Sequence, residues 1–447
     1  MPNINSKITH LGAEHSVTGS CHLLQVQGLN ILIDCGITQG SETLVPINQW
    51  PVKPSDINFL FLTHAHIDHI GRVPELIQNG FKGEIICTHA TQALLPLMLQ
   101  DALNFSDLSR DEAAKILSDI EQLSWGFEYQ ESFDLRKGIK FKFGRAGHIL
   151  GSCWIRFELP DGFNIVFSGD LGAKNTPILP DPDIPEPCDL LIMESTYGDK
   201  THEDRTLRVQ KLGNVLIKAL SDKGKVLIPA FALGRVQELI YEMDRLFLDP
   251  GFPFLNSKTP IPVFIDSPLG LRITEIYSSL SEYWDKEAKE LLQKGDHPIK
   301  FKSLYGVENH ADHIKLMDIS SPAIIVAGSG MCNGGRIIDH LKTGLNNPKT
   351  DILFVGYQAK GTTGREILTN KDKSDRSVLI DGKSYTNKAS VHQLTGYSGH
   401  ADQPGLIEWA RAINPKLVKL IHGEQTAQSA LKKQLRLCNI QVSGIET

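Results

Sequence analysis

The sequence predicts an α/β protein built from two kinds of region. Residues 1–200 contain short apolar runs that end at polar residues, a pattern typical of strands joined by turns. After about residue 200, strand-like runs alternate with helical segments, which indicates a mostly parallel sheet covered by helices. The length of 447 residues allows two or three domains with substantial cores.

The first region contains several predicted strands and one clear helix. Strands are expected at residues 31–34, 58–63, 84–88, 165–168 and 190–194. A helix is expected over residues 107–123, because Ser109-Arg110-Asp111-Glu112 is a typical helix start. Few other long helices are expected here, so we predict that the chemistry of this region is carried by strand ends.

The second region predicts a repeated strand–helix arrangement. The predicted strands at 225–228, 263–266 and 323–327 are each followed by a helix. The first helix begins near residue 234, the second runs through residue 276 and the third covers residues 335–341.

Composition restricts the classes of function and the compartment. The net charge of −6 argues against a general nucleic-acid coat protein, which would be basic. It does not exclude a nuclease, because metal ions and a few arginines can make a cleft locally positive. No segment reads as a signal peptide or a membrane span, and the seven cysteines include no CxxC pair. We therefore expect a cytoplasmic protein with reduced thiols and no membrane partner.

The most informative motif is a dense cluster of metal-binding residue types. His64, His66, Asp68 and His69 fall within six residues, directly after the apolar run 59–62. Imidazoles with a carboxylate suit zinc, and the first two histidines would face the same way on extended backbone. Asp68 and His69 follow the turn and could reach a second ion. Further candidates at later strand ends are His148, Asp170 and His422, each of which could equally be structural when taken alone.

In this chain order, the HxHxDH motif and the three later residues resemble the metallo-β-lactamase superfamily. The resemblance implies an αββα sandwich, in which two sheets lie between outer helices, and two Zn²⁺ ions per chain. The implied ligands are His64, His66 and His148 for the first ion, Asp68, His69 and His422 for the second, and Asp170 as the bridge. Asp34, after the strand 31–33, resembles the first motif of the family and would support the metal loop without binding metal.

Two further motifs resemble the β-CASP group of that superfamily. Glu194 follows the strand 190–193 in Glu-Ser-Thr-Tyr-Gly, and His400 lies in Ser-Gly-His-Ala-Asp. The group contains nucleases of messenger-RNA 3′-end cleavage, ribonuclease J and DNA-repair nucleases. The resemblance implies an α/β β-CASP cap domain inserted into the metallo-β-lactamase domain. The expected boundaries are 1–204 for the first part of the metal domain, 205–385 for the cap and 386–447 for the C-terminal part.

The resemblance predicts a zinc-dependent ribonuclease that hydrolyses RNA phosphodiester bonds, as an endonuclease or a 5′-exonuclease. Asp68, Glu194 and His400 are the predicted catalytic residues around a metal-activated water. We expect His400 to be the general acid, oriented by Glu194 through a charge-assisted hydrogen bond. The alternative is that His400 is a buried structural residue bonded to a carboxylate.

The cap supplies candidates for binding the phosphates of single-stranded RNA. The glycine-rich segment 328–336 follows an apolar strand and precedes a helix, so its backbone N–H groups could approach an anion. Arginine side chains beside such loops match phosphate oxygens. The predicted phosphate-binding residues are Arg235, Ser329, Gly330, Arg336 and Arg365. Tight turns with capping arginines are the alternative. Because the chain resembles a compact form without appended RNA-binding domains, the remaining grip must come from the cleft or from a second subunit of a homodimer.

Two features of the cap are expected to play no part in the chemistry. The histidines of the segment 310–313 are expected on a solvent-facing helix. Cys332 lies in a candidate phosphate loop, where it could be exposed to oxidation.

One alternative function lies within the nuclease class, and two belong to other classes. A DNA nuclease of the same group is the main alternative, since metal and phosphate contacts do not read the 2′-hydroxyl. A thioesterase or lactonase of the same fold would lack the cap and the His400 motif. A non-catalytic scaffold would have lost metal ligands, all seven of which are present here.

Overall fold

The computed structural model describes residues 6–40, 42–104, 106–252, 260–319, 322–373 and 376–443. The chain divides into two compact units. Unit 1 consists of Met1–Thr201 together with His400–Thr447, and unit 2 consists of His202–Gly399. Unit 1 is therefore assembled from two segments of the chain that are separated by the whole of unit 2.

Unit 1 contains two six-stranded sheets. The first sheet has the order β1 (Ser6–Gly12), β2 (Cys21–Val26), β3 (Leu29–Ile33), β4 (Phe59–Phe61), β5 (Glu84–Thr88) and β6 (Ser124–Phe127). The second has the order β20 (Leu417–Leu420), β11 (Leu190–Met193), β10 (Asn164–Phe167), β9 (Cys153–Glu158), β8 (Lys140–Arg145) and β7 (Ser132–Asp134). Strand β20 comes from the C-terminal segment and pairs in parallel with β11 from the N-terminal segment.

Successive side chains along β10, in the second sheet, point into two different hydrophobic cores. In β10, Ile165 and Phe167 face a core that also contains Phe59 and Phe61 of the first sheet, whereas Val166 faces the opposite side. That opposite side packs against Leu406 and other apolar residues of the C-terminal segment. Because successive side chains of a strand point to opposite faces, the sheet is covered on both sides.

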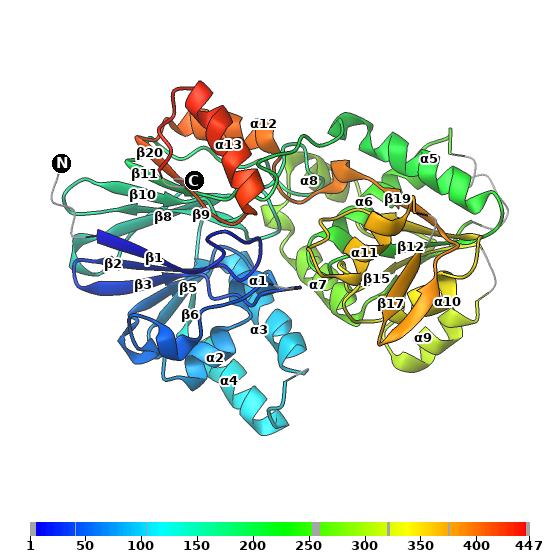
Figure 1. Cartoon of the computed structure of the whole chain (residues 1–447), viewed down its shortest axis with the longest axis horizontal. Coiled ribbons are helices and arrows are strands. Elements are labelled where there is room, and N and C mark those ends of the chain that lie inside the picture. The colour runs from blue at the N-terminus through cyan, green and yellow to red at the C-terminus, as the bar shows by residue number, and fades with distance from the viewer. Residues whose placement is uncertain are drawn as a thin grey trace. The chain divides into compact units, whose positions relative to one another are not determined.

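Helices form the two outer layers of unit 1 (Figure 1). Those after the first sheet's strands are α1 (Ile67–Ile70), α2 (Val73–Gln78), α3 (His89–Leu103) and α4 (Arg110–Leu123). Those of the C-terminal segment are α12 (Gln403–Ile413) and α13 (Gln425–Leu437). The predicted αββα layering is confirmed.

One helix of unit 1 was not expected from the sequence. Helix α3 spans 15 residues, although this part of the chain was predicted to contain few long helices. Its apolar residues are spread around the helix because it contacts β5, β6, α1 and α4, so no clear period marks it. The predicted helix 107–123 begins later, at Arg110, where Ser109 caps it through a capping box with Glu112.

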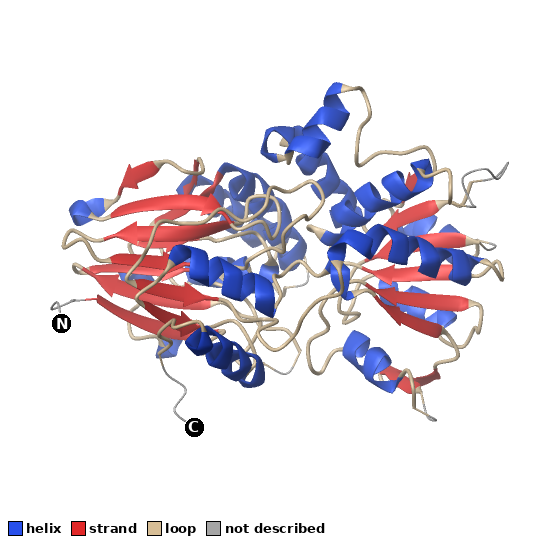
Figure 2. Ribbon diagram, turned by 90° about the horizontal axis from the view of Figure 1, so that it is seen from above, coloured by secondary structure: helices blue, strands red, loops and turns tan. Residues whose placement is uncertain are grey.

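Unit 2 contains a parallel six-stranded sheet between helices (Figure 2). Its order is β14 (Leu304–Gly306), β13 (Val263–Asp266), β15 (Ala323–Ala327), β12 (Lys225–Pro229), β16 (Thr350–Phe354) and β19 (Ser390–Gln393). Its helices are α5 (Arg208–Leu220), α6 (Arg235–Leu248), α7 (Pro268–Ser279), α8 (Lys286–Gln293), α9 (His310–Met317), α10 (Ile337–Gly344) and α11 (Thr363–Asn370). A hairpin of β17 (Ser377–Ile380) and β18 (Lys383–Thr386) follows α11 in the chain and precedes β19. The predicted strand–helix alternation is confirmed.

The central strands of unit 2 are covered on both faces. All five residues of β15 are buried, as expected for a strand that helices cover on each side. The helices of both units are too short or too polar to cross a membrane, as far as the described residues go.

Candidate metal centre

The HxHxDH motif forms a tight loop at the end of β4. Thr63 to His66 follow the strand, and α1 begins at Ile67. This places Asp68 and His69 on the single turn of α1, whereas His66 stays on extended backbone. The loop packs closely on the segment after β3, because a Cβ atom added to Gly36 would meet the Asp68 carbonyl oxygen at 1.5 Å. Only glycine allows this approach.

The first group of predicted ligands converges on one point. Nε2 of His64 and Nε2 of His148 each lie 3.1 Å from Nδ1 of His66. Oδ2 of Asp170 lies 3.6 Å from the His64 nitrogen and 3.7 Å from the His148 nitrogen. Ligand atoms around a tetrahedral zinc ion with bonds of about 2.0–2.1 Å lie roughly 3.3 Å apart. The four side chains therefore fit a zinc ion at their centre.

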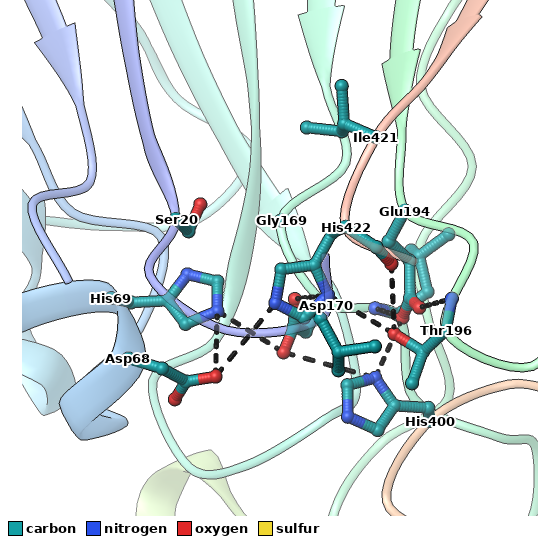
Figure 3. Close-up of polar contacts among 12 residues, drawn as sticks. Ser20, Asp68, His69, Gly169, Asp170, Glu194, Thr196, His400, Ile421 and His422 are labelled. Carbon is teal, nitrogen blue, oxygen red and sulfur yellow. Dashed lines mark hydrogen bonds and ion pairs between the residues drawn. The ribbon is translucent and has the colours of Figure 1, made fainter. Parts of the chain in front are cut away.

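The second group of predicted ligands, Asp68, His69 and His422, also gathers beside Asp170 (Figure 3). Nε2 of His69 is 3.4 Å from Asp170 Oδ2, and Nε2 of both His69 and His422 is 3.9 Å from Asp68 Oδ2. These two histidine nitrogens and Asp170 Oδ1 are buried, and no described residue forms a hydrogen bond with them. Buried polar atoms without a partner are rare, so their grouping supports a cation between them.

The protonation of the histidines fits metal binding. Burial lowers the pKa of His64 well below its usual value, which keeps the ring neutral as a ligand must be. Burial also disfavours the charged form of His69, but the charges of Asp170 and Asp34 outweigh it and raise its pKa well above the usual value. A metal ion at this ring must therefore displace a proton.

Asp34 and Thr63 hold the ligand loop in place. Oδ1 of Asp34 accepts hydrogen bonds from the backbone and hydroxyl of Thr63 at 2.8 and 3.1 Å. Its Oδ2 lies 2.7 Å from Nδ1 of His69. The Thr63 hydroxyl also lies 3.0 Å from Nδ1 of His64. Each contact leaves the Nε2 atom of the histidine free for metal, which is how carboxylates behind metal-binding histidines act.

Hydroxyl groups also hold the loops that carry the later ligands. The Ser152 hydroxyl accepts the backbone N–H groups of His148 and Ile149 at 3.0 and 3.2 Å. The Thr196 hydroxyl lies 3.1 Å from Nδ1 of His422. Sequence reasoning missed Thr63, Ser152 and Thr196. A hydroxyl next to a motif residue was the only signal, and serine and threonine are too common for it to be selective.

Glu194 and His400 meet beside the bridging aspartate. Glu194 directly follows β11 and is 1% exposed, and its Oε1 accepts the backbone N–H of Leu171 at 2.7 Å. The same oxygen lies 3.1 Å from Nδ1 of His400, which is 3.9 Å from Asp170 Oδ2. Burial alone would lower the pKa of His400, but the charges of Glu194 and Asp170 raise it to about 9. In the metal-free protein the ring is thus a proton donor at neutral pH.

The predicted phosphate loops of unit 2 lie at one edge of its sheet. The segment 328–336 follows β15, and the backbone N–H of Thr363 at the start of α11 donates to Asn333 at 3.2 Å. A Cβ atom on Gly330 would meet the backbone nitrogen of Phe231 at 2.8 Å, so the segment after β12 is close as well. The structure therefore brings Ser329 and Gly330 near the α11 N-terminus.

The three predicted phosphate-binding arginines differ in their surroundings. Arg235 is buried and forms an ion pair with Glu238. Arg336 donates to Asp266, to the Val307 carbonyl and to the Glu308 carbonyl at 2.7–3.0 Å. Arg365 is exposed and makes a 3.3 Å hydrogen bond to the Gln358 carbonyl. Arg365 is the most accessible of the three.

One expectation about the cap was wrong in part and a second was wrong. The segment 310–313 starts a helix, α9, with His310 exposed as expected, but His313 is 1% exposed and lies 2.6 Å from Asp266. It faces the sheet because Asp266 at the end of β13 provides a buried partner. Cys332 is fully buried in the cap core, and burial raises its thiol pKa, so it is shielded from oxidation rather than exposed.

Family models match nearly the whole chain. Residues 17–230 match the metallo-beta-lactamase superfamily, and residues 236–367 match the Beta-Casp domain. Residues 385–447 match a Zn-dependent metallo-hydrolase RNA specificity domain. A crystal structure of a protein of unknown function from Enterococcus faecalis V583 has the same fold. It aligns with a TM-score of 0.56 at 14% identity, over 99% of this chain and 98% of that one.

Several curated proteins are similar over nearly the whole of this chain. The chain is 36% identical to the ribonuclease TTHA0252 of Thermus thermophilus, over 98% of this chain and 97% of that protein. It is 31% identical to the transcription termination factor FttA of Methanosarcina mazei, over 99% of this chain and 71% of that protein. The cleavage and polyadenylation specificity factor 73 of Drosophila melanogaster is 30% identical, over 96% of this chain and 61% of that protein. The chain belongs to the metallo-β-lactamase superfamily and, within it, to the β-CASP group of metal-dependent nucleases.

Proposed function

We propose that this protein is a ribonuclease that uses two zinc ions to hydrolyse RNA phosphodiester bonds. The observation that carries the proposal is the placement of Asp170, whose carboxylate lies within 3.4–3.7 Å of histidine nitrogens from both ligand groups. The names of the related proteins, which include a ribonuclease, support RNA as the substrate. The match to an RNA specificity domain in residues 385–447 supports the same choice.

The proposed ligands divide between the two sites. His64, His66 and His148 would hold one ion, Asp68, His69 and His422 the other, and Asp170 would bridge them. When bound, such a pair of ions lowers the pKa of a water molecule and offsets negative charge on the attacked phosphate. Asp68 is 17% exposed, so its carboxylate can also accept a proton from the attacking water.

His400 supplies the proton that the leaving 3′-oxygen requires. Glu194 accepts a hydrogen bond from Nδ1 of His400, so the proton available for transfer is the one on Nε2. A general acid of this kind contributes roughly 10²- to 10⁴-fold to the rate.

The cap loops are proposed to bind the RNA backbone. Backbone N–H groups around Ser329 and Gly330 and the start of α11 could receive a phosphate, and Arg365 could neutralise its charge. Arg235 and Arg336 would act less directly, because each already binds a group within the cap.

The test is a time course on RNA of one sequence, labelled at the 5′ end in one sample and the 3′ end in the other. Zinc-loaded protein should cut both samples, and chelator-treated protein should cut neither until zinc is restored. Mononucleotides from the start indicate a 5′-exonuclease, and internal fragments an endonuclease. DNA of the same sequence is the control. If the protein cleaves DNA faster than RNA, the substrate is DNA rather than RNA. Hydrolysis of small thioesters without cleavage of either nucleic acid would overturn the proposal.

A further inference from the structure

A buried histidine that the proposed mechanism does not use lies behind the metal centre. His22 is on β2 and is 2% exposed. Its Nε2 atom lies 3.3 Å from the Ser20 hydroxyl, and its Nδ1 atom lies 3.0 Å from Nδ1 of His10, its partner on β1. A ring held at both nitrogens inside a core has one fixed orientation, so it can orient the groups that it contacts.

The contacts continue from His22 to a proposed metal ligand. The Ser20 hydroxyl donates to Asp34 Oδ2 at 3.3 Å, and the same oxygen lies 2.7 Å from Nδ1 of His69. The backbone N–H of Ser20 donates to the carbonyl of Asp68 at 2.8 Å. Ser20, which Figure 3 places beside His69, therefore contacts the support of one proposed ligand of the second ion and the backbone of another. His22, Ser20, Asp34 and His69 also line one small cavity.

We infer that His22 is a positioning residue of the metal centre, which fixes the Ser20 hydroxyl and through it the Asp34–His69 pair. This inference rests on the proposed metal-binding role of His69.

The direction of every hydrogen bond in this chain of contacts follows from elementary chemistry. A carboxylate only accepts, so the single Ser20 hydroxyl proton goes to Asp34. Ser20 can then only accept from His22, which must carry its proton on Nε2. Burial lowers the pKa of His22 well below its usual value and that of His10 to about 4, so both rings are neutral at pH 7. The His22 Nδ1 atom is therefore an acceptor, and His10 carries its proton on Nδ1.

The same series of hydrogen bonds leads through Asp34 to His69, a proposed metal ligand. Asp34 accepts the Nδ1 proton of His69, so the Nε2 lone pair of His69 is directed to the ion. Removing the His22 donor frees the Ser20 hydroxyl to rotate, and the Asp34 carboxylate loses a fixed partner. Partners behind metal ligands contribute about 10- to 100-fold to metal affinity. Because His22 acts through two further groups, we expect the low end of that range.

The first experiment measures zinc affinity with a competing chelator on the full chain. His22→Phe should weaken the second of two zinc equivalents about 10-fold and leave the first unchanged. Ser20→Ala, a smaller change at the surface of the same cavity, should do the same. His22→Gln, whose amide can donate to Ser20, should restore most of the affinity. His89→Phe is the matched control, because His89 is a half-exposed histidine of the same unit, and its affinities should equal those of the wild type.

Wild-type affinities in both His22→Phe and Ser20→Ala would overturn the inference and leave the proposed function intact. Absence of zinc from the wild type would instead overturn the proposed function.

The second experiment tests the direction of the contacts without metal. Nitrogen-15 NMR of histidine-labelled protein distinguishes ring nitrogens that carry a proton from those that do not. We expect His22 to carry its proton on Nε2 and His10 on Nδ1, with signals assigned from the His22→Phe and His10→Phe spectra. A proton on Nδ1 of His22 would overturn the inference, whatever the zinc content.

Discussion

Two buried clusters of histidine and aspartate in this protein use the same residue types for different purposes. In unit 1, Asp170 Oδ2 lies 3.4–3.7 Å from the nitrogens of three histidines. In unit 2, Asp266 Oδ2 lies 2.6 Å from His313 and 2.7 Å from His340. The shorter distances are those of direct hydrogen bonds, whereas the longer ones leave room for an ion between the groups.

The charge around each aspartate supports the same distinction. Arg336 donates to the second oxygen of Asp266 at 2.8 Å, which puts a permanent positive charge where a metal ion would be repelled. Burial would raise the pKa of Asp266, but hydrogen bonds from His340, His313 and Arg336 outweigh it and lower the pKa. Spacing and local charge, rather than residue type, thus separate a metal site from a structural cluster.

The two clusters should differ most in zinc content and turnover when the carboxylate of Asp170, the proposed bridge, is removed. Asp170→Asn should lose zinc and reduce turnover by roughly 10³-fold or more, because several kcal/mol of charge stabilisation disappear. Elemental analysis and RNA cleavage measure the two effects. Asp266→Asn is the matched control and should keep its zinc. Loss of zinc from the control would make the cap cluster a metal site.

His400→Ala should reduce turnover by about 10²- to 10⁴-fold, since the leaving oxygen loses its proton donor. Zinc content should stay at the wild-type value, because the ring is assigned no metal. His310→Ala, at the exposed start of α9, controls for loss of a histidine elsewhere. If zinc falls together with activity in His400→Ala, the residue is a ligand or a structural support instead.

Asp266→Asn should lower the free energy of unfolding by about 3 kcal/mol, because Arg336 loses its buried partner. The lowered pKa of Asp266 gives this contribution a definite pH dependence. It is complete above the ordinary aspartate pKa of about 3.9 and is lost as pH falls through the lower, folded-state value. Urea unfolding of metal-free protein at pH 7, 5 and below 4 measures the difference between variant and wild type. A difference that grows in acid would contradict this assignment.

The smallest effect is expected at the exposed arginine of the cap. Arg365→Ala should weaken RNA binding about fivefold, or roughly 1 kcal/mol, without changing zinc content. The slope of log affinity against log salt should fall by about 1, as for one lost phosphate contact. Arg411→Ala, an exposed arginine on α12, serves as the control. Equal affinity and slope in Arg365→Ala would remove that side chain from the RNA surface.

The strand–helix alternation and the HxHxDH motif could be predicted from the residues alone because both depend on local spacing, whereas the αββα layers were expected only from the family resemblance. Alternating strand residues and the density of HxHxDH need no knowledge of distant partners. Contacts between distant parts of the chain could not be predicted in this way: Thr196 meets His422 across 226 positions, and Asp266 meets His340 across 74. Thr63 and Ser152 lie close in sequence to the predicted ligands that they contact, and they were missed because serine and threonine are too common to be selective. Helix α3 was missed because contacts on several sides remove the period that marks an amphipathic helix.

The order of segments in the chain has a consequence for synthesis. His400 and His422 follow the whole of unit 2 in sequence. Strand β20 must pair with β11 before His422, which follows β20, can reach the metal centre. A nascent chain that has emerged from the ribosome only as far as unit 2 carries His64, His66 and His148 but neither the proposed proton donor nor the last proposed ligand. In the proposed mechanism, cutting activity therefore requires that translation has passed residue 422.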